Sequence, residues 1–362
     1  MMVDTLTKQT FHISTMKENT YVSVTILLAC LILALGGKEV KCIRRDKNTS
    51  GAPLNQKVNT TIVVDRGDVY DCIDVNLQPA FSHPLLKHHK IQMEPSSFPQ
   101  SIPTKSPSIH ASPPTQLSLI ECPTGTIPIL RNNRRVHKLV RAIGKVISKN
   151  EQQEVAGFEY LDVLYGTRAK INIYEPKVKN TSKDLSASWI QIKGIQRVGL
   201  ADGIGAGSWV YPSYSGDNLA RFHVAWVDGL KNTIFPDHDC GAFVQVSSIV
   251  GLGGRLKPVS IYGGPQYIID VAIFKGGYVQ GPTASSDSPQ MGSGHFASEE
   301  RGKASVVRNI LIVDNENKYA NPDARKARLV VTSSSKYTAK AYGYGYNDYG
   351  VHTYYGGPGA FV

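Results

Sequence analysis

Residues 204–212 read Ile-Gly-Ala-Gly-Ser-Trp-Val-Tyr-Pro, and residues 215–217 read Ser-Gly-Asp. Alternate glycines free the backbone at the start of this stretch, whereas Trp209–Tyr211 is rich in residues that favour β-structure. The pattern predicts a glycine turn that leads into a strand. A dinucleotide-binding loop would need a helix directly after its glycines. Because proline, serine and glycine follow at 212–216, we expect neither a helix nor a nucleotide site here.

Short alternating segments surround this stretch. Polar and apolar residues alternate over 169–174, 187–192, 221–227 and 243–246, and glycines separate these segments. Alternation with a period of two is the signal of half-buried strands. We therefore expect a mainly β fold, an antiparallel β-sandwich of two sheets over residues 150–362, preceded by an extended arm.

The composition agrees with this fold and limits the classes of binding partner that we expect. The 362 residues include 33 glycines and 18 tyrosines, and charged residues make up only 19%. The net charge of +11 suits a basic protein that meets anionic polymers such as acidic wall polysaccharide. No nucleic-acid-binding motif is present, so we expect no nucleic-acid partner.

The N-terminal region contains an almost unbroken apolar run over residues 22–37. About 20 apolar residues are needed to span a membrane, so this shorter run is typical of a secretion signal. Ala34 and Gly36 offer a cleavage site. We expect residues 1–41 to be a removable leader and the protein to be secreted, with no stable membrane partner. The alternative is a membrane-bound form that keeps an uncleaved signal anchor.

A secreted chain can be glycosylated and oxidised. Asn48, Asn59 and Asn180 each begin an Asn-x-Ser/Thr sequon. Cys72 and Cys122 are the favoured disulfide pair, although sequence alone leaves the connectivity open.

Residues 42–149 predict an arm ahead of the sandwich. Residues 94–114 are rich in proline and serine and predict an extended linker. Residues 136–147 carry apolar side chains at helical spacing and predict one basic amphipathic helix. The histidines near residues 83–89 lack a cysteine–carboxylate set, so we expect no metal site and no cofactor.

Several motifs in order resemble those of the neprosin family. They are Tyr-Asp-Cys-Ile-Asp at 70–74, Cys-Pro-x-Gly-Thr-Ile-Pro-Ile at 122–129, Ile-x-Ala-Gly with Val-Tyr-Pro at 204–212, Ser-Ile-Tyr-Gly-Gly-x-Gln at 260–266, Met-Gly-Ser-Gly-His-Phe at 291–296 and Tyr-Tyr-Gly-Gly-Pro-Gly at 354–359. This family comprises secreted plant proteins typified by a glutamic-type prolyl endopeptidase. The resemblance implies an activation peptide followed by a domain in which two glutamates face each other across a groove.

The chain departs from the family pattern at both glutamates. The first position is Gly205, and alignment of the Gly-Gly-x-Val segment puts Tyr278 at the second. Compared with the family, the chain also lacks a block of strands between residues 267 and 276, which would leave an exposed sheet edge. Three other carboxylates could substitute for the missing pair: Asp202, Glu299 and Glu300. We expect Glu299 and Glu300 to be solvated loop charges. His295 and Ser293 lack an acidic partner that sequence can identify, which argues against a serine-hydrolase site.

The sequence thus predicts a secreted, catalytically impaired relative of the glutamic peptidases. The expected binding groove for an extended proline-containing peptide or a glycan is lined by Trp209, Tyr211, Tyr262, Gln266, His295 and Tyr278. One alternative is an active endopeptidase that cuts near proline with relocated carboxylates. Another is a basic structural protein of the cell wall, bound to acidic polysaccharide.

Overall fold

The computed structural model describes most of the sandwich and part of the arm. The described residues are 9–17, 20–28, 58–64, 67–82, 90–94, 97–100, 114–117, 120–131, 154–179, 184–193, 203–228, 233–238, 243–274, 289–342 and 349–359. The predicted helix over 136–147 lies outside them. In the described part of the chain, no helix is long and apolar enough to cross a membrane.

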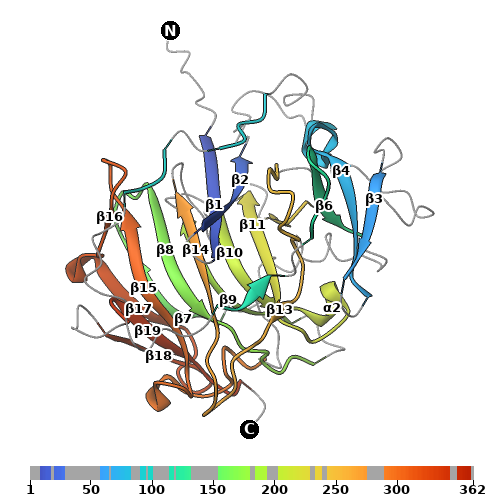
Figure 1. Ribbon diagram of the computed structural model, residues 1–362. Helices are drawn as coiled ribbons and strands as arrows, with labels where there is room; N and C mark the ends of the chain where they lie inside the picture. The colour runs from blue at the N-terminus through green and yellow to red at the C-terminus, as the bar shows by residue number, and fades with distance from the viewer. Residues whose placement is uncertain are drawn as a thin grey trace.

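Two antiparallel sheets form the body of the molecule, as expected (Figure 1). The larger sheet has the order β18-β19-β15-β8-β14-β1-β2, with β16 attached to β15. Its strands are β1 (Gln9–Lys17), β2 (Thr20–Leu28), β8 (Gly166–Asn172), β14 (Ile268–Phe274), β15 (Ser305–Val313), β16 (Tyr319–Ala320), β18 (Thr338–Tyr342) and β19 (His352–Gly356). The second sheet has the order β12-β11-β10-β9, from strands β9 (Ser186–Lys193), β10 (Gly203–Val210), β11 (Arg221–Asp228) and β12 (Thr233–Pro236).

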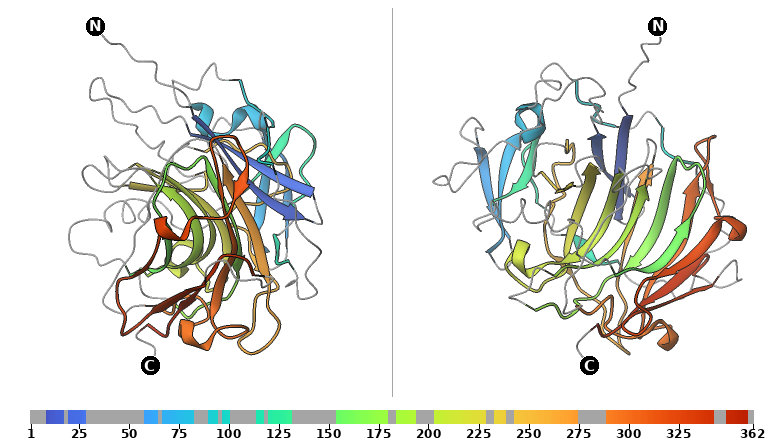
Figure 2. Two further views of the ribbon diagram at one scale, coloured as in Figure 1. Left: turned by 90° about the vertical axis from the view of Figure 1, so that its left-hand side faces the viewer. Right: turned by 180° about the vertical axis from the view of Figure 1, so that it is seen from behind.

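One apolar core joins these two sheets. Figure 2 shows the two sheets from the side and from behind. In the larger sheet, Ala169 lies opposite Val271 and Ile171 lies opposite Ile269, and all four are buried. Alternate residues of the second sheet, including Ile204, join the same cluster. The alternation seen in the sequence therefore marks the residues that hold the sandwich together, and the mainly β, antiparallel fold is confirmed.

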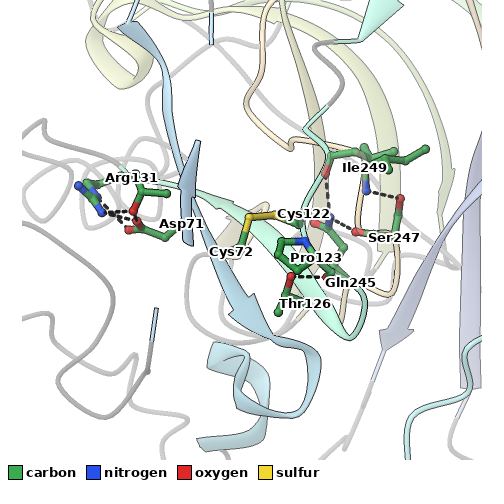
Figure 3. Close-up of a disulfide and its surroundings, with 11 residues drawn as sticks. Asp71, Cys72, Cys122, Pro123, Thr126, Arg131, Gln245, Ser247 and Ile249 are labelled. Carbon is green, nitrogen blue, oxygen red and sulfur yellow. Dashed lines mark hydrogen bonds and ion pairs between the residues drawn. A yellow bond between two sulfur atoms is a disulfide. The ribbon is translucent and has the colours of Figure 1, made fainter. Parts of the chain in front are cut away.

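The arm forms a smaller sheet beside the sandwich. Its strands β3 (Val58–Val63), β4 (Val69–Asp74) and β6 (Thr126–Leu130) pair in that order, while β5 (Gln116–Leu117) pairs with β13 (Leu256–Lys257) of the main domain. A disulfide joins Cys72 of β4 to Cys122, the pair favoured from sequence (Figure 3). Beside it, Arg131 donates to Asp71 from Nε at 2.9 Å, a contact that also stays within the arm.

The central glycine stretch differs from its prediction in two ways. The glycines lie inside β10 rather than in a turn before it, since β10 already begins at Gly203. A glycine within a strand often marks the close approach of another group. The expected absence of a helix is also wrong, because α2 (Pro212–Ser215) forms a single turn. Proline at its first position fixes a helical φ, and Gly216 ends the turn at φ +77°.

The strand predicted over 243–246 is also absent, although this segment belongs to the described part of the chain. Its backbone bonds instead to a side chain of the arm. The Gln78 amide donates to the carbonyl of Gln245 at 2.7 Å and accepts the Gln245 N–H at 2.6 Å. The amide takes the place of a neighbouring strand, so the segment stays extended without a ladder.

Among the described residues, four 3-10 turns and a two-stranded sheet complete the arm and the domain. The 3-10 turns η2 (Val75–Leu77) and η3 (Pro79–Ser82) follow β4, and η6 (Ala297–Glu299) and η7 (Ala324–Lys326) lie in the C-terminal half. A two-stranded sheet of β7 (Ala156–Tyr160) and β17 (Ala327–Val331) borders β18.

Candidate functional site

Gly205 lies on one face of β10, in the centre of the second sheet. Its direct neighbours are Gln191 on β9 and Ala225 on β11. Residues two apart on a strand share a face, so Gly207 and Trp209 lie on the same side of the sheet as Gly205. The opposite side, with Ile204, packs in the shared core. Trp209 and Ala225, on the Gly205 side, belong to the same cluster, so apolar side chains flank both faces of β10.

The indole of Trp189 covers this position. A Cβ built on Gly205 would lie 2.5 Å from Cζ2 of Trp189, and one on Gly207 would lie 2.6 Å from its Cβ. The Trp189 Nε1–H donates to Oε1 of Gln191 at 3.2 Å, which holds the ring in this orientation. An aromatic ring thus occupies the space into which a longer side chain at residue 205 would extend.

A buried aromatic group continues along the same face. The rings of Trp189 and Trp209 lie 5.5 Å apart, and Trp209 stacks on His223 at 4.8 Å. His223 Nδ1 lies 2.7 Å from Oδ2 of Asp237, and its buried Nε2 has no hydrogen-bond partner among the described residues. A histidine–aspartate pair can orient an imidazole, but a reacting group beside Nε2 is missing from the described residues.

Residues of the arm contact the main domain beside this face. Arg221 of β11 bonds to Asp68, the residue that precedes β4. Leu130 of β6 approaches Gly253 of the main domain, and a Cβ at Gly253 would lie 3.0 Å from Cδ2 of Leu130 and 3.7 Å from Cε1 of His223. A hollow of about 10 Å³ lies between β10, β11 and β12, lined by Ile204 and Asp237 among others.

The expected groove residues differ in their surroundings. Trp209 and Tyr211 are buried, with 4% and 3% of their surfaces exposed. Tyr262, Gln266 and His295 gather at a different place, near the start of η6. The groove expected from sequence, which also includes Tyr278 outside the described residues, therefore stays a prediction.

The residues near η6 centre on Tyr262 and His295. Their rings stack at 3.9 Å, the Tyr262 hydroxyl donates to Oε2 of Glu299 at 2.6 Å, and His295 Nδ1 lies 3.1 Å from Oε1 of the same carboxylate. The hydrogen bond from Tyr262, helped by the His295 side chain, holds the pKa of Glu299 below its ordinary value. Gln266 lies close by and donates to the carbonyl of Gly302 at 3.1 Å.

Sequence analysis missed Glu299 as the acidic partner of His295, and only their spacing of four residues could have suggested it. Even so, Ser293 accepts the backbone N–H of His295 at 3.3 Å rather than contacting its ring. Glu300 accepts from Lys340 at 2.5 Å and from Tyr342, and the bond from Lys340 lowers the pKa of Glu300. Both glutamates bond to neighbours while their side chains stay partly exposed, at 31% and 42%.

An apolar hollow of about 180 Å³ lies elsewhere, where β7, β17 and β18 meet. Phe158, Leu329, Tyr342 and Val351 are among the residues that line it, and Arg328 is its charged neighbour. It lacks paired carboxylates, so it offers apolar contact rather than proton transfer.

Several predicted residues lie outside the described residues: Tyr278, Asp202, Asn48 and Asn180. Asn59 lies in β3 and is exposed. The described part of the face therefore offers aromatic contact surface and one covered arginine, without a carboxylate pair at Gly205.

Two family profiles match the chain. The profile of the neprosin activation peptide matches residues 61–158, and that of the neprosin domain matches residues 182–276 and 274–358. The first covers the arm sheet, and the second covers β9 to β12 together with most of the larger sheet.

Proposed function

The chain belongs to the neprosin family, as its motifs predicted, and we propose that it is a secreted member that binds peptide without hydrolysing it at the family's rate. Glutamic catalysis uses one carboxylate as base and a second as acid or oxyanion donor. Gly205 can supply neither role. The observation that carries the proposal is the Trp189 ring, because it fills the space that a carboxylate side chain at residue 205 would need.

The remaining described carboxylates give little support to relocated catalysis. Glu299 and Glu300 are each tied to a phenol, and their low pKa values disfavour the protonated form that an acid catalyst requires. General acid–base assistance contributes about 10²–10⁴-fold per group, so loss of both family glutamates leaves little turnover.

The test compares wild type with variants on a proline-containing peptide at low pH, after acid treatment, with products followed by mass spectrometry. We expect no cleavage above that of a heat-denatured sample, together with saturable binding that quenches tryptophan fluorescence. The variants Asp202→Asn, Glu299→Gln and Glu300→Gln serve as controls. Wild-type cleavage that one of them abolishes would locate a relocated carboxylate and contradict the proposal. Cleavage that none of the three variants changes would contradict both the proposal and a catalytic role for Asp202, Glu299 or Glu300.

Secretion is the second part of this proposal, and the apolar run over 22–37 supports it. N-terminal sequencing of protein recovered from the medium of a eukaryotic host should give a start between Gly36 and Cys42. Glycosidase treatment should lower the mass if exposed Asn59 carries a glycan. A membrane-bound product that begins at Met1 or Met16 would show an uncleaved anchor instead.

A further inference from the structure

Arg221 begins β11, and only 7% of its side chain is exposed. Its guanidinium meets two carboxylates. Nε and Nη2 donate to Asp217 at 3.1 and 2.7 Å, while Nη1 and Nη2 donate to Asp68 at 2.8 and 3.1 Å. Nη1 also donates to the carbonyl of Gly253 at 2.8 Å. These contacts use all five N–H donors of the arginine.

The two carboxylates belong to different parts of the chain. Asp217 and Arg221 lie in the neprosin domain, whereas Asp68 lies in the activation peptide. Burial by itself lowers the pKa of Arg221, but hydrogen bonds to Asp217 and Asp68 outweigh burial and raise it. Departure of the activation peptide leaves Asp217 in place and removes Asp68. Two N–H donors on a permanently charged fork then lack their acceptor, and such donors are costly to leave unpaired.

The turn at residues 251–254 lies beside Arg221 and packs against Tyr70, which follows Asp68 by two positions. Tyr70 is fully buried, and its ring packs on Gly251 and Gly254 of the neprosin domain. A Cβ at either glycine would lie 2.7 Å from Tyr70. The same turn presents the Gly253 carbonyl to Arg221. The occupant seen here is thus a peptide with an acidic residue and, two positions later, an aromatic one.

This place adjoins the candidate groove. Arg221 lies directly opposite Trp209 across β10 and β11, and Gly205 shares the face of Trp209. A ligand held at Arg221 would therefore extend over the same face as the family's first glutamate position.

We propose that Arg221 and the turn 251–254 form a binding site for an acidic side chain of a peptide ligand, and that Asp68 occupies this site in the intact chain. The inference rests on the peptide binding proposed above and specifies its ligand as acidic. A planar arginine fork recognises a carboxylate with two parallel hydrogen bonds. The aromatic notch beside it favours a peptide over a uronic acid polymer, which would bring the carboxylate alone.

The first experiment uses chemical rescue in the full chain. Asp68→Ala leaves a space of carboxylate size at Arg221, and the arm backbone remains. We expect a lower thermal midpoint that acetate restores in a saturable manner, whereas the isosteric neutral acetamide does not. Wild type should show no acetate-dependent shift because Asp68 fills the fork. Asp68→Ala with Arg221→Lys should lose the rescue, because an ammonium cannot form both bonds. An exposed pair provides a further control, with Asp323→Ala opposite Arg325 showing no rescue.

The second experiment separates ligand classes. It uses a variant with a protease site inserted after Asn150. Cleavage at that site leaves the arm held to the main domain by non-covalent contacts, with both pieces in solution. Blocked Asp-Val-Tyr should release the arm at a concentration at least tenfold below that of blocked Asn-Val-Tyr, as measured by gel filtration. Absent acetate rescue, or equal release by both peptides, would overturn the inference. Trigalacturonate that releases the arm as readily as the aspartyl peptide would assign the site to polysaccharide and overturn it too. Cleavage of the added peptide would contradict the absence of hydrolysis proposed above, but not the acidic-ligand site at Arg221.

Discussion

The ring of Trp189 lies over Gly205, so that a Cβ at residue 205 would come within 2.5 Å of Cζ2 of the indole. The ring therefore restricts the side chain that residue 205 can carry. A glutamate cannot simply be restored, because backbone on the adjacent strand also lies close, with the Ile190 carbonyl 2.8 Å from that Cβ.

We expect Gly205→Glu alone to destabilise the protein by about 1–3 kcal/mol or more, because it overpacks a filled site. Adding Trp189→Ala should remove the clash with the ring but not that with the Ile190 carbonyl, so the double variant should lose less than the sum of the two single losses. Gly157→Glu is the matched control, since this strand glycine has nothing within 4 Å of its Cβ position. Urea titrations measure the free energy of unfolding of each variant. If Gly205→Glu were as mild as Gly157→Glu, the ring would not be a fixed obstacle.

The second prediction concerns the arm and its disulfide. The proline-rich linker over 94–114 lies between Cys72 and Cys122, which are 50 residues apart. A cut within residues 101–113 should therefore leave one species on a non-reducing gel and two fragments after reduction. Release of the N-terminal fragment without reductant would show that the disulfide does not form in the secreted protein.

The same bond should stabilise the arm. By the loop-entropy model, closing a loop of this length contributes roughly 4 kcal/mol. Cys72→Ser with Cys122→Ser should thus make the arm sensitive to protease well before the main domain unfolds. Simultaneous loss of both parts would indicate that they unfold as one unit.

Gln78 supplies the third prediction. Its amide is 1% exposed and satisfies both backbone groups of Gln245. Gln78→Ala leaves a buried N–H and a buried carbonyl unpaired, at roughly 1–3 kcal/mol each. We expect weaker docking of the arm, read as faster hydrogen exchange at residues 243–247. Asn76→Ala removes an exposed side chain whose Nδ2 donates to Asp74, and it should leave that exchange unchanged.

Gln78 also shows why sequence identified the fold better than its details. Alternating residues in 169–174, 187–192 and 221–227 fall in strands β8, β9 and β11, because burial of one face dictates that pattern. The segment 243–246 alternates equally well but lies beside a glutamine from a distant part of the chain. A pattern within a segment carries no information about such a partner.

The candidate site was predictable to a similar extent. Gly205 could be aligned from its motif, and its lack of a side chain needs no structure. Trp189 over Gly205, Asp237 beside His223 and Asp68 at Arg221 all depend on strand register or on contacts between the arm and the domain. The burial of Trp209 and Tyr211 likewise depends on neighbours that sequence does not identify.

Glu159 gives a prediction about pH. It lies on β7, where it bonds to Lys193 of β9 and accepts from Arg328 of β17 at 2.6 Å. Burial alone raises the pKa of Glu159, but the bonds from Lys193 and Arg328 outweigh it and lower the pKa. A carboxyl whose folded pKa is depressed stabilises the fold above its unfolded pKa of about 4.3 and loses that effect as pH falls through the folded value.

Glu159→Gln should therefore reduce the free energy of unfolding at pH 7 and make little difference once the pH lies below the folded pKa. Denaturant titrations across pH 2–7 would measure this convergence. Glu316→Gln, which removes an exposed pair with Lys318, should show a much smaller difference at pH 7. A constant gap between wild type and Glu159→Gln at all pH values would mean that packing, and not charge, explains the effect.

The last prediction concerns the sheet edge at β14. The N-terminal strands complete this edge: β1 pairs with β14 from His12 opposite Phe274 to Thr15 opposite Val271, and β2 pairs with β1. Figure 1 shows the two strands side by side next to β14. Removal of residues 1–41 as a leader would take both strands away. The remaining edge is an apolar strand with unpaired N–H and carbonyl groups, which is a template for association.

Chains that begin at Cys42 should therefore self-associate with rising concentration, whereas chains that begin at Met1 should remain smaller in sedimentation velocity experiments. A synthetic peptide of residues 9–17, added in excess, should bind the shorter chain and reduce its association, since it can occupy the edge of β14. A scrambled peptide of the same composition should have no effect, because its side chains no longer match the register of β1. If the shorter chain stayed monomeric and ignored both peptides, β14 would not present an open edge after leader removal.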